Sequence, residues 1–150
     1  MLYTFKFDKK EYKLEDKSGK DICKAKLKDH KLLRPDEFEF KNKVADTKET
    51  HDIGKTTALT VNWKFTDNSS QDIPLSHSIT FDGENIWQFI EDKGYTFSSA
   101  SADGKDVYTV KQNGNKVATI TWGKKPEVET DLDDPYMVFI ICFAIAKISE

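Results

Sequence analysis

The chain has 150 residues, of which 37% are hydrophobic, 12% aromatic and 33% charged. This length predicts a single domain over residues 1–150, and the apolar content excludes a disordered chain. The net charge of −3 argues against a nucleic-acid-binding protein, whose surface would be strongly basic. Residues 1–43 nevertheless carry 13 basic and 9 acidic side chains, whereas residues 44–150 carry 10 and 17. A molecule polarised in this way can present a basic face despite its acidic total.

Most of the sequence alternates apolar and polar residues, which is the pattern of half-buried β-strands. The alternation begins at Tyr3, Phe5 and Phe7 without the continuous apolar segment of a signal peptide, so we expect a cytoplasmic protein. It continues through Cys23, Ala25 and Leu27; Phe38 and Phe40; Leu59, Val61, Trp63 and Phe65; Ile79 and Phe81; and Ala118, Ile120 and Trp122. Each run predicts a strand with one buried face and one solvated face.

Glycine-containing turns separate these strands at residues 17–20, 82–85, 103–106 and 113–116. Asp-Gly and Asn-Gly supply the positive φ that tight hairpin turns require. A strand is expected to restart after each glycine, at Ile22, Ile86, Val107 and Val117. The polar residues 42–55 show no period and are assigned to a loop. The succession predicts an antiparallel meander.

The carboxyl-terminal segment departs from the alternation. Asp134 is a good helix N-cap and Pro135 suits the first helical position, so we predict a helix from Pro135 to Ser149. The β-branched residues leave a buried strand as the alternative. The eleven residues from 136 to 146 are all apolar, so the helix would have no polar face, yet they fall short of the about 20 that span a membrane. Protein must therefore surround the helix.

A closed barrel is the structure expected to surround it. A helix with its side chains is about 10–12 Å wide, and an eight-stranded barrel is already filled by its own side chains. Known barrels with a central helix have about eleven strands. The roughly 130 residues before Asp133, at about 11 per strand and turn, provide about twelve strands. We therefore expect a mainly β fold, a closed antiparallel barrel of about twelve strands around a central hydrophobic helix at residues 135–149.

The strand–Asp/Asn-Gly–strand units and the terminal Asp-Asp-Pro-Tyr-Met-Val-Phe-Ile-Ile-Cys-Phe-Ala-Ile-Ala-Lys-Ile resemble the tubby-like superfamily. Within it, the chain is most similar to small bacterial proteins akin to plant LURP-one-related proteins and phospholipid scramblases. The resemblance covers essentially the whole chain and implies a twelve-stranded barrel around a hydrophobic helix. For tubby it implies phosphoinositide binding, and for the scramblases an association with membrane lipid. No part of this sequence matches tubby's basic phosphoinositide pocket, so the resemblance implies no site residue.

A lysine-rich stripe is the strongest candidate site. It consists of Lys24, Lys26, Lys28, Lys31 and Arg34. The period of two places the first three on one outward strand face, and each lysine near an anionic membrane contributes about 1 kcal/mol. The alternative is a solvated strand face whose charge prevents aggregation. Asp29 and Asp36 dilute the patch.

An acidic string precedes the predicted helix. It consists of Glu127, Glu129, Asp131, Asp133 and Asp134, which alternate at first with less polar residues. Carboxylates of this kind could hold Ca²⁺, but the string lacks the glycine and spacing of an EF-hand loop. An exposed strand face that leads into a helix cap is the simpler interpretation, so no metal site is assigned.

The remaining reactive side chains indicate no catalytic or cofactor site. His30, His51 and His77 lack zinc-ligand spacing. Cys23 and Cys142 form no CxxC motif, and we expect free thiols packed in the core rather than a nucleophile. The serines at residues 99–104 belong to a turn.

The three tryptophans, Trp63, Trp87 and Trp122, are assigned to the core. For Trp87 the alternative is a partly exposed anchor at an interface.

These observations favour a non-enzymatic domain that binds anionic lipid head groups or a protein partner through its exterior, peripheral to a membrane. One alternative is an enzyme with a site at the barrel mouth, although no acid–base pair or nucleophile supports it. The other is a lipocalin-like carrier of a small molecule. A carrier needs an empty interior, whereas the apolar helix would fill this one.

Overall fold

The computed structural model describes residues 1–8, 10–28, 37–52, 60–64, 70–74, 80–81 and 84–149. Within these ranges the chain forms thirteen β-strands and two α-helices, so the prediction of a mainly β fold is confirmed. The helices are α1 (Ile86–Asp92) and α2 (Pro135–Ser149). The strands are β1 (Leu2–Phe7), β2 (Glu11–Asp16), β3 (Asp21–Lys28), β4 (Glu37–Asn42), β5 (Thr47–Asp52), β6 (Thr60–Lys64), β7 (Ser70–Pro74), β8 (Thr80–Phe81), β9 (Glu84–Asn85), β10 (Tyr95–Ala102), β11 (Lys105–Gln112), β12 (Asn115–Thr121) and β13 (Glu127–Thr130).

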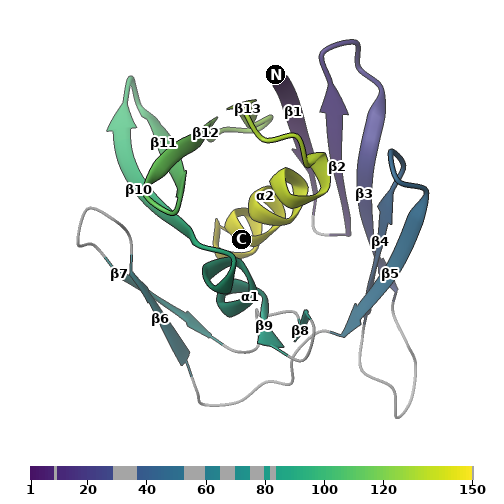
Figure 1. Cartoon of the computed structure of the whole chain (residues 1–150), viewed down its shortest axis with the longest axis horizontal. Helices are drawn as coiled ribbons and strands as arrows, with labels where there is room; N and C mark the ends of the chain where they lie inside the picture. The colour runs from purple at the N-terminus through teal and green to yellow at the C-terminus, as the bar shows by residue number, and fades with distance from the viewer. Residues whose placement is uncertain are drawn as a thin grey trace.

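Nine of these strands form one antiparallel sheet that curves around α2 (Figure 1). Their order is β10-β11-β12-β13-β1-β2-β3-β4-β5, so the first strand of the chain joins two meanders. The other strands pair as β6 with β7 and β8 with β9. No ladder joins the edge strands β5 and β10 within the described ranges, and the closed barrel of about twelve strands therefore remains a prediction.

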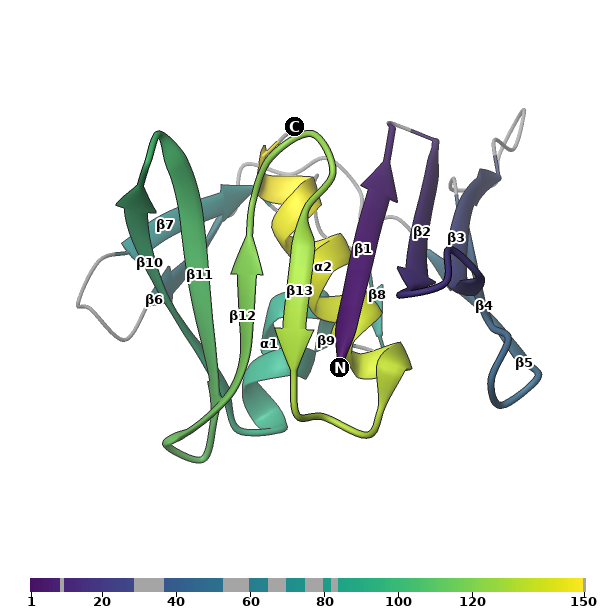
Figure 2. The ribbon, with the colours of Figure 1, turned by 90° about the horizontal axis from the view of Figure 1, so that it is seen from above.

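Helix α2 has the bounds that the sequence predicts. The Asp134 carboxylate accepts a hydrogen bond from the Met137 backbone N–H at 3.2 Å, which confirms the N-cap. Residues 137–146 are each at most 5% exposed, so the helix is buried on every side. Figure 2 shows β12, β13 and β1 crossing one side of it, and α1 packs on another. Among the described helices, none is long and apolar enough to cross a membrane.

Aromatic rings of α2 and of the strands pack against one another on the concave face of the sheet. Tyr12, Ala25 and Phe40 lie opposite one another on β2, β3 and β4. The Phe143 ring lies 4.6 Å from that of Tyr12 and 5.0 Å from that of Phe40. Phe143 therefore sits over the small residue between two large ones. This large–small–large sequence across the strands allows the helix side chain to interlock with the sheet.

The hairpin turns follow the glycine pattern where the structure describes them. Asp103 and Gly104 have φ values of 53° and 77°, and Asn113 and Gly114 have 52° and 86°. Two successive residues with positive φ are the requirement of a type I′ turn. The turn at Gly19 is also formed, with a φ of 85°. Asp82 and Gly83 lie outside the described residues, as do Leu59, Phe65 and Ile79.

Three predictions for the chain are wrong. The serines assigned to a turn, Ser99 and Ser101, lie in strand β10 and pair with β11, and only Asp103 and Gly104 form the turn. Residues 42–55 contain strand β5, whose described positions are polar on both faces because it forms the edge of the sheet. Ile86 begins helix α1 instead of a strand, and its partners Trp87 and Ile90 recur at helical spacing on the buried face.

The tryptophan assignments are confirmed where the side chains are described. Trp87 is 1% exposed and lies edge-on to the Phe97 ring at 5.8 Å, so it is a core residue and not an interfacial anchor. Trp122 is partly buried against the core, and the Trp63 side chain lies outside the described residues.

Replacement of Ile141 by Asp tests whether the fold requires an apolar α2. Ile141 is 2% exposed, and an unpaired carboxylate there would lose its hydration without gaining a partner. We expect Ile141→Asp to abolish the cooperative thermal transition followed by circular dichroism. Ile141→Val, which keeps the site apolar, should cost about 0.5–1.5 kcal/mol. An Asp variant that melts like the Val variant would contradict this account of α2.

Candidate functional site

Strand β3 carries the lysine-rich stripe on its outer face. Lys24, Lys26 and Lys28 alternate there with the inward Cys23 and Ala25, as the period of two predicts. The Lys24 and Lys28 side chains are 30% and 45% exposed. The other two members of the predicted stripe, at positions 31 and 34, lie outside the described residues.

The register of the sheet creates a second alignment of lysines, which runs across the strands. Lys6 on β1 lies opposite Lys13 on β2, and Lys13 lies opposite Lys24 on β3. Lys24 in turn lies opposite Lys41 on β4, which lies opposite Lys48 on β5. We call these five residues the lysine row. It crosses neighbouring strands that are about 4.7–4.9 Å apart.

Carboxylates on both sides of the lysine row pair with it. Lys6 lies 2.9 Å from Glu15, and Lys13 lies 3.0 Å from Glu11 and 3.8 Å from Asp21. Like charges directly opposite one another destabilise a sheet, and these ion pairs offset that repulsion. Each exposed ion pair contributes only about 0–1 kcal/mol to stability. The pairs therefore compensate for the repulsion between the lysines without strongly stabilising the sheet.

Glu39 is the carboxylate with the most lysine partners on this face. Its oxygens lie 3.3 Å from the Lys48 nitrogen, 3.6 Å from that of Lys28 and 3.9 Å from that of Lys41. Partial burial acts to raise the pKa of Glu39, but the hydrogen bond from Lys48 and the three lysine charges hold it below its ordinary value. Glu39 is therefore ionised at neutral pH and partly neutralises the row.

The outer face of β1–β5 is nevertheless net basic. Its described lysines, including one in the turn after β4, are Lys6, Lys13, Lys24, Lys26, Lys28, Lys41, Lys43 and Lys48. Its described carboxylates, including one in the same turn, are Glu11, Glu15, Asp21, Glu37, Glu39 and Asp46. We call this surface the basic face. The outer positions of β12 and β13 differ, because Thr119 and Thr121 lie opposite Glu129 and Glu127.

The acidic string forms an exposed strand face and a helix cap, as the simpler interpretation predicts. Glu127 and Glu129 face outward on β13, and Asp134 caps α2. Among the described side chains, no group of His, Cys, Asp and Glu has the arrangement of a metal site. His30 and His77 lie outside the described residues, and so does the side chain of His51 on β5.

Both cysteines are free thiols inside the core, as expected. Burial raises the pKa of Cys23 to about 12, and the nearby Asp134 charge adds to this shift. Burial raises the pKa of Cys142 still further. The thiolate is the reactive form of cysteine, so both side chains act as small apolar groups.

A tyrosine–carboxylate contact ties the start of α2 to the edge strand. The Tyr136 hydroxyl donates a hydrogen bond to Glu49 on β5 at 2.8 Å. Burial raises the pKa of Tyr136, and the hydrogen bond to Glu49 raises it further. Tyr136 therefore stays protonated at neutral pH and keeps its donor. The contact helps to position α2. In the part of the chain described, no further titratable group is arranged beside this pair for proton transfer.

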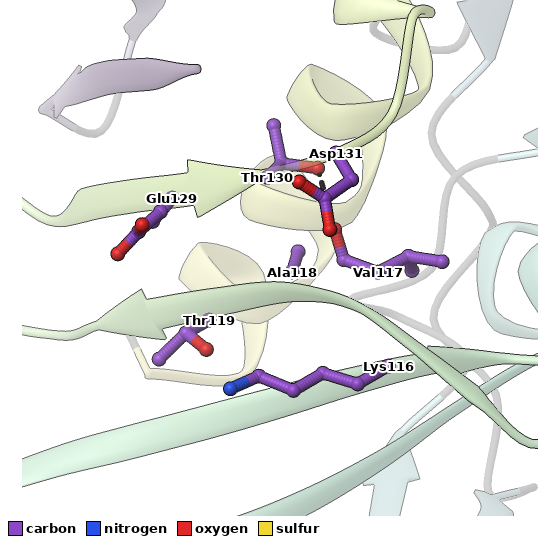
Figure 3. A pocket seen from close by; sticks show the side chains of 7 residues that line it. All are labelled: Lys116, Val117, Ala118, Thr119, Glu129, Thr130 and Asp131. Carbon is purple, nitrogen blue, oxygen red and sulfur yellow. Dashed lines mark hydrogen bonds between the residues drawn. The ribbon is translucent and has the colours of Figure 1, made fainter.

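A pocket of about 210 Å³ lies between β12 and β13 (Figure 3). The Thr130 hydroxyl at its base donates to the Val117 carbonyl at 2.8 Å and accepts from the Leu132 N–H at 3.0 Å, so it serves the sheet. The charged side chains of the lining, Lys116, Glu129 and Asp131, stand well apart in Figure 3. They do not converge on a common ligand position.

Comparison with known proteins identifies no relative of this chain. No family model matches the chain, and neither a curated protein nor a solved structure matches it. A function must therefore be inferred from the described residues themselves, and the basic face is the feature with the clearest chemistry.

Thiol labelling tests the burial of the cysteines. At pH 8 a thiol with a pKa near 12 is ionised to only about 0.01%, and neither thiol is open to solvent. We expect a thiol-specific reagent to label native protein negligibly and to label two thiols per chain after denaturation. Ser101→Cys provides the positive control, because residue 101 is exposed and should react at once. Native labelling as fast as in that variant would contradict inert packing.

Proposed function

We propose that this protein is a non-enzymatic domain that binds the anionic head groups of a membrane surface through its basic face. The observation that carries the proposal is the concentration of lysines on the outer side of β1–β5. Anionic lipid attracts such lysines at about 1 kcal/mol each near the surface. A protein with this face would associate peripherally, from the cytoplasm.

The filled interior supports binding at the exterior. The concave side of the sheet is occupied by α2, whose Phe139 and Phe143 rings pack against Phe5, Tyr12 and Phe40. A small-molecule carrier needs space in that position, so a lipocalin-like function is disfavoured. An enzyme with a site at one end of the sheet would need converging acid–base groups, and the described pockets do not supply them.

We further propose that the sheet closes around α2 into the tubby-like barrel that the sequence resembles. The support is positional: α1 and the pairs β6–β7 and β8–β9 lie between the edge strands β5 and β10 in Figure 1. The all-apolar α2 also favours closure, because an open side would expose it to water. A structure determined by experiment would test the closure by showing whether ladders continue from β5 to β10.

Co-sedimentation with vesicles tests the lipid proposal. We expect binding to vesicles that contain anionic lipid, little binding to neutral vesicles, and weaker binding at physiological salt than at low salt, because salt screens exposed charges. Replacing Lys24, Lys26 and Lys28 together by Glu should abolish the binding. Absence of wild-type binding to anionic vesicles at low salt would reject the lipid proposal and leave a protein partner as the alternative ligand of the face.

A further inference from the structure

We infer that the lysine row, rather than the stripe along β3, is the line on which the basic face meets an anionic lipid surface. We also infer that the carboxylates beside the row, above all Glu39, act as built-in counter-ions that limit its affinity. This inference rests on the proposed function and names the contact residues. The row includes Lys6, Lys13, Lys41 and Lys48, none of which belongs to the stripe that the sequence indicates.

The neighbours of each lysine distinguish the row from the stripe. Along the row, each lysine lies opposite another lysine. Along the stripe, Lys26 lies between Glu11 on β2 and Glu39 on β4, and Lys28 lies opposite Glu37. The directly opposite neighbours of Lys26 and Lys28 are therefore carboxylates, whereas the carboxylates that pair with the row reach it from other positions of the same strands. Directly opposite positive charges stand closest to one another along the row, and their potentials add there.

The relative exposure of the two charge signs favours contact through the lysines. The row side chains are between 30% exposed, at Lys24, and 60% exposed, at Lys48. Glu11 and Asp21 are 32% and 27% exposed, much like Lys13 and Lys24, but Glu15 and Glu39 are only 14% and 16% exposed. Lysine stems can lie along a surface while the ammonium group reaches solvent. An approaching anionic surface thus meets the ammonium groups before it meets the Glu15 and Glu39 carboxylates.

Glu39 reduces the positive charge that the row presents to a membrane. It lies within 3.3–3.9 Å of the nitrogens of Lys48, Lys28 and Lys41, so one carboxylate partly neutralises three cations. Exposed ion pairs of this kind are weak and exchange readily. A lipid phosphate can therefore replace Glu39 as a lysine partner, but it must compete with a charge that is always present. Removal of that charge is expected to strengthen binding.

Because the sheet is curved, the lysines of the row should contribute unequally to membrane binding. The sheet bends around α2 (Figure 1). The row lies on its convex side, because the alternate residues of these strands are the buried ones. A flat membrane placed on β3 contacts the middle of the row first, while Lys6 and Lys48 at its ends stand further back. A flexible polyanion could instead follow the curve and contact all members equally. The two kinds of partner therefore predict different patterns of loss.

Paired lysine substitutions test the row on vesicles of stated composition, 30% phosphatidylserine in phosphatidylcholine at low salt. If each central lysine contributes about fivefold, Lys13→Gln with Lys41→Gln should weaken partitioning about 25-fold. The matched pair Lys26→Gln with Lys28→Gln changes the same charge on the same face and should lose less than the row pair. The end pair Lys6→Gln with Lys48→Gln should also lose less. Lys105→Gln with Lys116→Gln, at exposed turns on the other half of the sheet, should bind like wild type.

The outcomes separate this inference from the proposed function. Wild-type binding with equal losses in the row pair and the Lys26/Lys28 pair would overturn the row while lipid binding stands. Equal losses at the centre and at the ends would contradict the grading of the lysines by the curvature of the sheet. Absence of wild-type binding would overturn the proposed function and the row with it. Circular dichroism of every variant confirms that losses do not come from unfolding.

Removal of the built-in counter-ion should increase binding to anionic vesicles. We expect Glu39→Gln to partition about fivefold more tightly than wild type into the same vesicles. Glu129→Gln, which makes the same change of net charge on β13, is the control. When the two variants are compared at physiological salt, where the Debye length is about 8 Å, it should change partitioning far less. An equal gain in both variants would show that total charge alone determines binding, and would overturn the role of Glu39.

Discussion

The burial of α2 is the constraint on which the rest of the structure depends. Its residues 137–146 are apolar and at most 5% exposed, so no side of the helix tolerates water. Each large side chain buried there contributes about 1.5–3 kcal/mol relative to exposure. The strands that cover the helix, apart from the polar edge strand β5, must therefore present apolar residues on the concave side of the sheet. The alternation of β1 to β4 and the interlocking of Phe143 between Tyr12 and Phe40 follow from this requirement.

Because apolar side chains occupy the concave side of the sheet, the polar side chains of the same strands lie on the convex side. A strand directs successive side chains to opposite faces, so commitment of one face to α2 commits the other to solvent. In β1–β5 the solvated positions are occupied mainly by lysine and glutamate. Their ion pairs offset the repulsion between lysines in register, although each pair is weak. The basic face is thus a consequence of the same alternation that forms the core.

The proposed function follows from the division between the two sides. Packing in the interior holds the helix against the sheet. Burial raises the pKa values of Cys23 and Tyr136 and so keeps both side chains in their neutral forms. Reactive chemistry is therefore unsupported in the described core. An extended charged surface on a rigid sheet instead suits the recognition of another extended charged surface. The counter-ion role of Glu39 would make that recognition adjustable by a single charge.

The sequence by itself determined the features that depend on near neighbours. Asp134 and Pro135 specify where α2 begins, Asp103 and Gly104 specify a hairpin turn, and the period of two assigns Lys24, Lys26 and Lys28 to one face. Tertiary structure alone decided that the polar segment of β5 pairs with β4 as an edge strand and that Ile86 opens a helix that buries Trp87 and Ile90. It also decided the lysine row, since its members come from five strands. Alternation identifies the face of a residue, but only the register between strands, set by packing around α2, determines which residue lies beside it.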